Sequence, residues 1–95
     1  MNDSDQVDRT AQYLPEAGGV TMFTTSWCGY CRRLKMQLER EGIAFREVDI
    51  EDDEAAVDIV TEVNNGNRTV PTVLFPDGTT ATNPSAQEVR ERVSA

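Results

Sequence analysis

A strand–helix–strand pattern in the first half of the chain limits most strongly what this sequence can fold into. VTMFT at residues 20–24 is β-branched and aromatic, as strands are, and IAFREVDI at residues 43–50 predicts a second strand. Between them, Cys31, Leu34 and Leu38 repeat at the spacing of one helical face. Two strands joined by a helix lie parallel in one sheet with a right-handed crossover. The pattern therefore predicts an α/β fold.

A second helix is predicted after residue 50. The carboxylates EDD at residues 51–53 suit the positive N-terminal end of a helix. Asn65 and Gly66 mark its end. The apolar residues between these signals predict a buried helix face, made of Ala56, Val57, Val60 and Val63.

The last third of the chain is typical of a hairpin followed by a helix. TVLF at residues 72–75 and TTAT at residues 79–82 predict two strands, and the PDG turn between them predicts antiparallel pairing. SAQE at residues 85–88 is a capping box, which opens a final helix. The element order βαβαββα predicts a four-stranded mixed sheet flanked by three helices.

Length and charge limit the domain organisation and the partners. We expect one domain over residues 19–95, because residues 1–18 are polar and acidic and predict a flexible tail. A net charge of -8 and a pI of about 4.3 argue against nucleic acid and anionic membranes, since both are bound through Lys and Arg. The N-terminus has no signal-peptide pattern, so we expect a cytoplasmic protein. No stretch indicates a large apolar interface, so we expect a monomer.

The two cysteines, Cys28 and Cys31, form a CxxC motif. A structural zinc site takes four protein ligands, and with no histidine in the chain we predict no metal site within one copy. The cytoplasm keeps thiols reduced, which disfavours a purely structural disulfide. A CxxC motif between a strand and an amphipathic helix favours a redox pair.

Position assigns different roles to the two cysteines. Cys28 lies where the first strand meets the first helix, and the unpaired N–H groups there favour a thiolate and lower the pKa of the thiol. We therefore expect Cys28 to be the exposed nucleophile and Cys31 the more buried resolving cysteine. The basic residues that follow, Arg32, Arg33 and Lys35, either help to hold the thiolate or are solvated surface side chains, and the sequence leaves both open.

The stretch RTVPTV at residues 68–73 is the second candidate element of the site. Pro71 cannot donate to a strand ladder, so it marks the start of the third strand. Most X–Pro bonds in folded proteins are trans, but a cis bond after Val70 would leave the backbone groups of Val70 free. An extended thiol substrate could then pair with these groups.

These motifs together resemble a known family. WCGYC after a strand, followed downstream by TVP, resembles the glutaredoxin branch of the thioredoxin superfamily. With EVDIE, GNRTVPTV and TNPSA, the sequence resembles more narrowly the mycoredoxins, the glutaredoxin-like reductases of actinobacteria. The resemblance implies a thioredoxin fold, a cis Pro71 and catalysis by Cys28 with Cys31. It also implies mycothiol as the reducing co-substrate and mycothiolated proteins as partners.

The sequence departs from the broader family at one informative place. Typical glutaredoxins carry Gly-Gly and an acidic residue after the fourth strand, where they help to bind glutathione, and this chain has TNPSAQE there. We therefore expect mycothiol rather than glutathione. Thioredoxins usually place a proline between the cysteines, and this chain has Gly29 and Tyr30.

Further residues are candidates for substrate binding. We expect Trp27 and Tyr30 to form an apolar rim beside the cysteines, and Val70 and Pro71 to hold the substrate backbone. Candidates for a polar pocket around a sugar-bearing thiol are Asn67, Arg68, Thr69, Asn83 and Ser85, of which Ser85 is also explained as a helix N-cap.

Four other functions remain compatible with the sequence. They are a glutathione-type glutaredoxin, a thioredoxin-like reductase of protein dithiols, a dimer that holds a [2Fe–2S] cluster with outside thiols, and a structural CxxC with no exchange activity.

Overall fold

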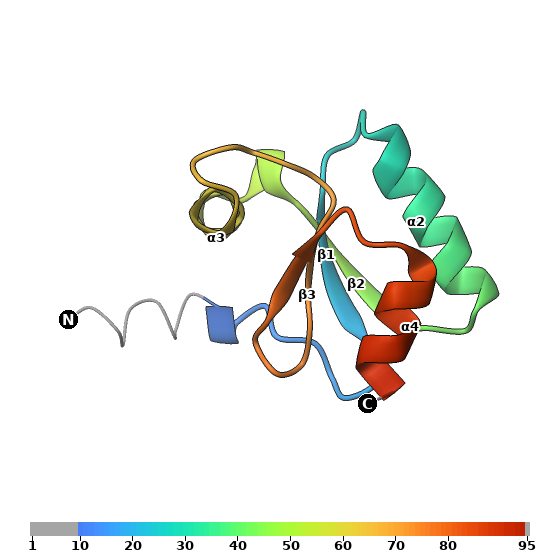
Figure 1. Ribbon diagram of the computed structural model, residues 1–95. Helices are drawn as coiled ribbons and strands as arrows, with labels where there is room; N and C mark the ends of the chain where they lie inside the picture. The colour runs from blue at the N-terminus through green and yellow to red at the C-terminus, as the bar shows by residue number, and fades with distance from the viewer. Residues whose placement is uncertain (1–9, 95) are drawn as a thin grey trace.

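The computed structural model describes residues 10–94 and confirms the predicted α/β architecture. Its four strands are β1 (Val20–Thr24), β2 (Phe45–Asp49), β3 (Thr72–Leu74) and β4 (Thr80–Thr82). They form one sheet in the order β2-β1-β3-β4 (Figure 1). β1 pairs with β2 in parallel, and β3 runs antiparallel to both β1 and β4.

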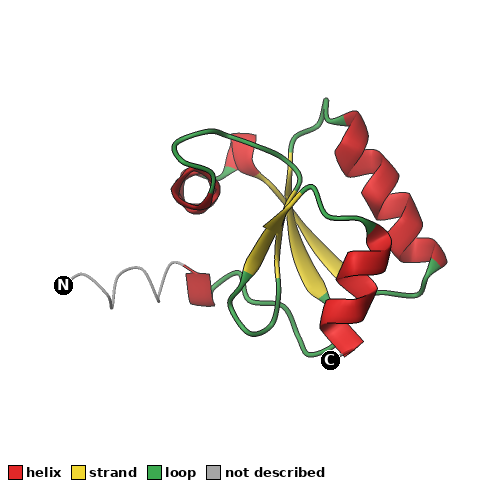
Figure 2. Ribbon diagram, viewed as in Figure 1, coloured by secondary structure: helices red, strands yellow, loops and turns green. Residues whose placement is uncertain are grey.

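Helices cover both faces of the sheet, which forms the middle layer (Figure 2). α2 (Gly29–Arg40) and α4 (Ala86–Ser94) lie on one face, and α3 (Glu54–Val63) lies on the other (Figure 1). A short 3-10 helix, η1 (Ile50–Asp52), leads from β2 into α3. None of the helices in residues 10–94 is both long and apolar enough to cross a membrane.

β1 is one of the two inner strands, and its side chains contribute to two hydrophobic clusters, one on each face of the sheet. Val20 and Met22 pack with Leu34 and Leu38 of α2 on one face. Phe23 packs with residues of α3 on the other face. Successive side chains of a strand point to opposite faces, so one buried strand supplies both clusters. Because β1 is anchored on both sides, the loop that follows it starts from a fixed point.

The predicted burial of one face of α3 is confirmed at the centre of the helix and is wrong at its last residue. Ala56 and Val60 are fully buried, and Ile59, which belongs to the same face, is buried with them. Val63 is 43 % exposed, since it is the last residue of the helix and the chain then turns away. Asn65 and Gly66 make that turn with positive φ angles of 58° and 90°, as their predicted role at the helix end requires.

The N-terminal segment differs from the predicted tail. Residues 1–9 of that tail lie outside the described residues, but within residues 10–18 the side chain of Tyr13 packs against the domain. Tyr13 is only 4 % exposed, and its ring lies 5.5 Å from that of Phe23. Its hydroxyl donates to Asp53 at 2.5 Å, and its carbonyl accepts from the Thr21 hydroxyl at 2.5 Å. A buried aromatic side chain contributes a large apolar area, so Tyr13 anchors this otherwise polar segment to the sheet.

Candidate active site

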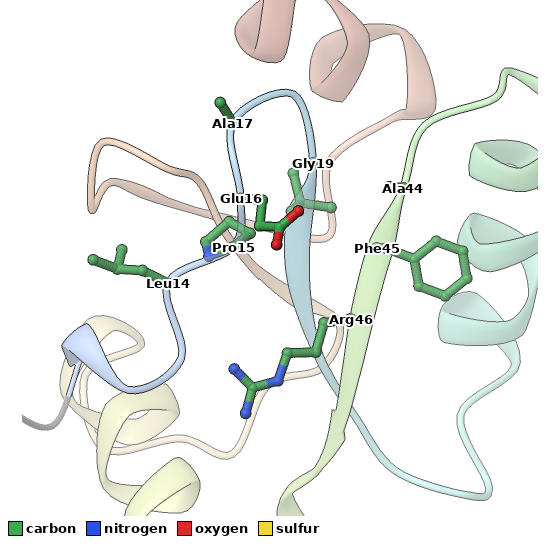
Figure 3. A pocket seen from close by; sticks show the side chains of 9 residues that line it. Leu14, Pro15, Glu16, Ala17, Gly19, Ala44, Phe45 and Arg46 are labelled. Carbon is green, nitrogen blue, oxygen red and sulfur yellow. The ribbon is translucent and has the colours of Figure 1, made fainter.

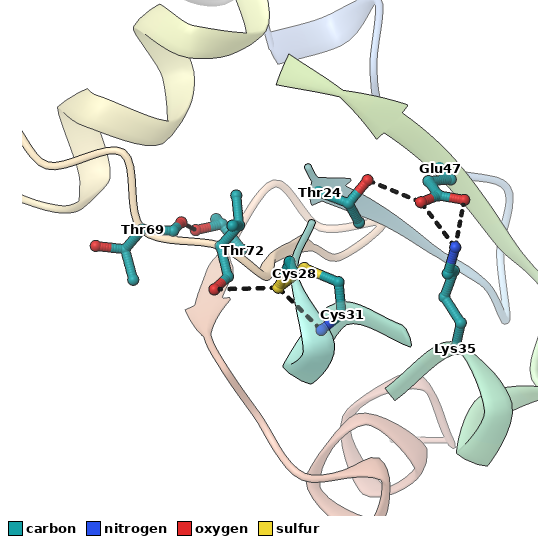
Figure 4. Close-up of a disulfide and its surroundings, with 8 residues drawn as sticks. Thr24, Cys28, Cys31, Lys35, Glu47, Thr69 and Thr72 are labelled. Atoms are coloured by element: carbon teal, nitrogen blue, oxygen red, sulfur yellow. Dashed lines mark hydrogen bonds and ion pairs between the residues drawn. A yellow bond between two sulfur atoms is a disulfide. The ribbon is translucent and has the colours of Figure 1, made fainter. Parts of the chain in front are cut away.

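Cys28 and Cys31 form a disulfide at the N-terminus of α2 (Figure 4). Cys28 is the N-cap residue, with an extended backbone, and Gly29 is the first residue of the helix. The N–H of Cys31 donates to Cys28 Sγ at 3.0 Å, so the sulfur takes the place that a Ser or Asp oxygen has in an ordinary N-cap. In the reduced protein the same N–H group favours the thiolate form of Cys28.

The burial of the two cysteines corrects one expectation. Cys28 is 4 % exposed and Cys31 is 1 % exposed, so Cys28 is not exposed in the disulfide form. The order of burial is the predicted one. The loop before β3 contacts Cys28, since the carbonyl oxygen of Val70 lies 3.9 Å from Cys28 Sγ.

The Val70–Pro71 peptide bond is cis, as the family resemblance implies. Pro71 is buried, and its carbonyl accepts from the N–H of Asn83 at 2.7 Å. Asn83 holds a φ of 49°, in the left-handed region that favours glycine. The structure therefore brings Val70, Pro71 and Asn83 together at the side of Cys28.

The basic cluster after Cys31 divides into two parts. Lys35 Nζ lies 3.0 Å from both carboxylate oxygens of Glu47, which also accepts from the Thr24 hydroxyl at 2.8 Å (Figure 4). Burial acts to raise the pKa of Glu47, but the hydrogen bonds from Lys35 and Thr24 outweigh it and hold the pKa below its ordinary value. Arg32 and Arg33 are exposed and form no ion pair within residues 10–94. The charge of Lys35 is thus already matched by a carboxylate.

Trp27 and Tyr30 flank the disulfide as large exposed rings. Trp27 is 67 % exposed, and its Nε1–H donates to Glu51 at 3.0 Å, which fixes the indole beside η1. Tyr30 is 64 % exposed and lines a cavity of about 300 Å³ together with Asn83 and Ser85. Both rings are exposed beside the cysteines, and their role as a rim for the substrate stays a prediction.

The remaining sequence candidates divide by position. Thr69 directly precedes Val70 and is half-buried, and its carbonyl accepts from the Thr72 hydroxyl at 2.8 Å. Arg68 is exposed in the same loop. Asn67 donates to the carbonyl of Asn64 at 3.1 Å, which is a contact within the loop. Ser85 Oγ accepts from the N–H of Glu88 at 3.0 Å, so Ser85 is the helix N-cap that its sequence position predicts.

The sequence interpretation missed three polar residues next to the site. Glu47 lies on β2 and Thr82 on β4, and Asn64 ends α3. Their positions in the sequence carry no signal, because β2 and β4 are opposite edge strands of the sheet and Asn64 contacts Thr82 only in the folded chain. Only the repeated Asn of residues 64–67, beside a Gly, marks this loop as a turn with unusual backbone geometry.

A larger pocket lies away from the cysteines. It measures about 420 Å³ and lies between the N-terminal segment and β2, with Leu14, Phe45 and Arg46 among its lining residues (Figure 3). None of the predicted site residues lines it. Within residues 10–94, no group of three or more side chains could hold a metal ion.

Comparison with known proteins supports the redox interpretation. The sequence profile of the glutaredoxin family matches residues 20–79, which include both cysteines and Pro71. The chain belongs to the glutaredoxin family. Members of this family are thiol-disulfide oxidoreductases, and the Cys28–Cys31 pair gives this chain the CxxC motif of such an enzyme.

Two similar proteins come from Mycobacterium tuberculosis and Corynebacterium glutamicum. A Mycobacterium tuberculosis protein with a provisional glutaredoxin name is 60% identical over 74 residues, which cover 78% of this chain and 88% of the relative. Mycoredoxin 1 of Corynebacterium glutamicum is 47% identical over 76 residues, which cover 80% of this chain and 94% of that protein. Among solved structures, the glutaredoxin of Methanosarcina mazei Go1 is similar with a TM-score of 0.67 and 25% identity, covering 83% of this chain and 81% of that one.

Proposed function

We propose that this glutaredoxin reduces mixed disulfides between proteins and mycothiol, with Cys28 as the nucleophile. The observation that carries the nucleophile assignment is the N-cap position of Cys28, where its sulfur accepts the N–H of Cys31 and faces the cis Val70–Pro71 bond. The 47% identity to Mycoredoxin 1 over most of both chains supports mycothiol as the small thiol.

The reaction begins with the reduced enzyme. The Cys28 thiolate attacks the mycothiol sulfur of the mixed disulfide, which forms a Cys28–mycothiol disulfide and breaks the bond to the client protein. The client leaves as a thiolate and takes up a proton. The thiolate of a second mycothiol then attacks the adduct, so mycothiol disulfide leaves and Cys28 is again a thiolate. In a two-cysteine route the Cys31 thiolate attacks Cys28 of the adduct instead, so mycothiol leaves as a thiolate and a Cys28–Cys31 disulfide forms, which other thiols must then reduce.

The surrounding residues act through binding. Val70 and Pro71 hold the substrate backbone against Cys28, because within residues 10–94 the N–H of Val70 donates to no backbone carbonyl. Trp27 and Tyr30 form the rim on which the substrate rests. Arg68, Thr69 and Asn83 contribute polar groups from the two loops beside the cis bond. The enzyme acts as a cytoplasmic monomer in this proposal, and no resident metal is required.

The loop after β4 supports mycothiol rather than glutathione as the small thiol. Asn83 has a positive φ, a conformation that favours glycine, and it belongs to the TNPSAQE stretch that this chain has where the family resemblance implies Gly-Gly in glutathione-binding glutaredoxins. Mycothiol carries sugars in place of the glutathione peptide, and the polar groups near Tyr30 suit hydroxyls.

The test is a direct comparison of two substrates. One peptide is prepared as a mixed disulfide with mycothiol and with glutathione, and each form is offered to the reduced enzyme with the matching free thiol. We expect a higher kcat/KM for the mycothiol form. Equal values, or a preference for glutathione, would reject mycothiol specificity and leave the coarser oxidoreductase assignment intact.

A further inference from the structure

A chain of side-chain hydrogen bonds ties together the two loops that flank the cis Val70–Pro71 bond. It begins at Thr82, whose hydroxyl donates to Asn64 Oδ1 at 2.6 Å. Asn64 Nδ2 donates to Thr72 Oγ1 at 3.0 Å, and the Thr72 hydroxyl donates to the carbonyl of Thr69 at 2.8 Å. We call these four residues, Asn64, Thr69, Thr72 and Thr82, the loop clamp.

The direction of the bonds in the loop clamp is consistent along its length. Each hydroxyl donates once and the Asn64 amide both accepts and donates, so no two donors face each other. Asn64 Nδ2 also donates to the carbonyl of Val60 at 2.8 Å, which fixes which side of the amide is nitrogen. Hydrogen bonds aligned in this way strengthen one another.

Both ends of the loop clamp stop one residue short of the site. Thr69 directly precedes Val70, whose carbonyl lies 3.9 Å from Cys28 Sγ. Thr82 directly precedes Asn83, whose N–H donates to the carbonyl of Pro71 at 2.7 Å. Figure 4 shows Thr69 and Thr72 beside the disulfide. The loop clamp therefore sets the position of the backbone groups that face Cys28 without touching the sulfur.

We propose that Asn64 and Thr82 are positioning residues that determine how tightly the enzyme binds its mixed-disulfide substrate. This inference rests on the proposed function, because the clamped groups matter only if the substrate pairs with Val70 and contacts Asn83. The loop between α3 and β3 is long and polar, and without the loop clamp its end near Cys28 would sample more positions. Ordering that end before binding lowers the entropy cost of association.

Thr82→Val is the sharpest test, since it removes one hydroxyl from an exposed residue and keeps the shape of the side chain. We expect KM for a mixed disulfide of mycothiol with a peptide to rise roughly two- to tenfold, the effect of one lost hydrogen bond, while kcat stays within about twofold. Thr82→Ser keeps the hydroxyl and should restore KM. Thr80→Val is the matched control, because Thr80 lies on the same strand and no hydrogen bond of its hydroxyl is found within residues 10–94.

A second variant tests whether Asn64 acts through the same bond. Asn64→Ala alone should raise KM. In the double variant Asn64→Ala/Thr82→Val, the total fold-increase in KM should be smaller than the product of the two single fold-increases. If the effects multiply, or if Thr80→Val raises KM as much as Thr82→Val does, the proposal is overturned. An unchanged KM in Thr82→Val overturns it as well.

Amide hydrogen exchange provides a readout that does not depend on turnover. In Thr82→Val the N–H of Asn83 should exchange faster than in the wild-type protein, with amides of β1 unchanged. A wild-type enzyme without activity on mixed disulfides would reject the proposed function, and unchanged exchange at Asn83 would reject the loop clamp itself.

Discussion

Two segments of this glutaredoxin border the same strand and differ in how their sequence encodes their role. The N-terminal segment, residues 10–18, leads into β1, and the redox segment, residues 25–35, follows it. The redox segment carries its chemistry in adjacent residues, because Cys28, the helix start and Cys31 lie within one turn. The N-terminal segment is held by one side chain, Tyr13, whose partners lie on distant elements. Changes in the redox segment should therefore alter activity, and changes in the N-terminal segment should alter stability.

The largest expected effect belongs to Cys28. Cys28→Ser should abolish turnover of a mycothiol mixed disulfide, because a hydroxyl is not a nucleophile toward disulfide sulfur at neutral pH. Cys31→Ser should keep much of the activity under the one-cysteine route. Initial rates for both variants check this. Activity in Cys28→Ser together with inactive Cys31→Ser would reverse the roles assigned to the two cysteines.

Tyr13→Ala should have the largest effect on stability. Removing a buried aromatic ring lowers the free energy of unfolding by about 3–5 kcal/mol, and here a hydrogen bond to Asp53 is lost as well. Urea unfolding measures the change. Leu14→Ala is the control, because the neighbouring Leu14 is 39% exposed, and it should lower the free energy of unfolding by less than about 1 kcal/mol. Below its unfolding midpoint Tyr13→Ala should keep kcat/KM, and a large loss of activity would contradict the separation of the two segments.

A pH titration sharpens the same contrast. Burial, together with the hydrogen bond to Asp53, raises the pKa of Tyr13 from 10.0 to about 12. The neutral phenol is favoured in the folded state. Its contribution to the free energy of unfolding is therefore fully present below pH 10 and is lost as the pH rises through about 12. Tyr13→Phe should remove this alkaline loss from the pH dependence of unfolding, whereas Tyr30→Phe, at the exposed second tyrosine, should leave it. Identical profiles in the wild-type protein and Tyr13→Phe would count against the buried phenol.

The smallest effect is expected at the edge of the redox segment. Lys35→Met should lower the free energy of unfolding by less than about 1 kcal/mol, because the pair with Glu47 is partly exposed and salt-screened. Since the pKa of Glu47 is depressed, the contribution of this carboxylate to the free energy of unfolding is present above the ordinary carboxyl pKa. This contribution is lost as the pH falls through the lowered pKa of the folded state. The rate of Cys28 alkylation against pH should not change. A raised Cys28 pKa in Lys35→Met would show that this ammonium does hold the thiolate.

The fold was predictable because its signals are local. Periodic apolar residues and turn residues predicted every strand and the last two helices close to their observed limits, and the N-cap position of Cys28 followed from where the first strand ends. The cis Val70–Pro71 bond was implied only by the family resemblance, since the residues alone favour the trans isomer.

Long-range packing could not be predicted in the same way. Tyr13 is one aromatic residue in a polar stretch, and nothing near it in sequence marks Phe23 and Asp53 as its partners. The contact of Cys28 with Val70 likewise involves a loop that follows it by 42 residues, and nothing near Cys28 in the sequence marks that loop as its neighbour. The same applies to the loop clamp, whose members lie in the loop between α3 and β3, on β3 and on β4.

Intact-protein mass spectrometry of reduced Cys31→Ser tests the central claim most directly. The variant is mixed with one equivalent of a protein–mycothiol mixed disulfide, without free mycothiol, and quenched with acid. Attack by Cys28 on the mycothiol sulfur predicts an enzyme heavier by one mycothiol, attached at Cys28, and a fully reduced client protein. An enzyme linked covalently to the client, or an unmodified enzyme beside intact mixed disulfide, would contradict the account.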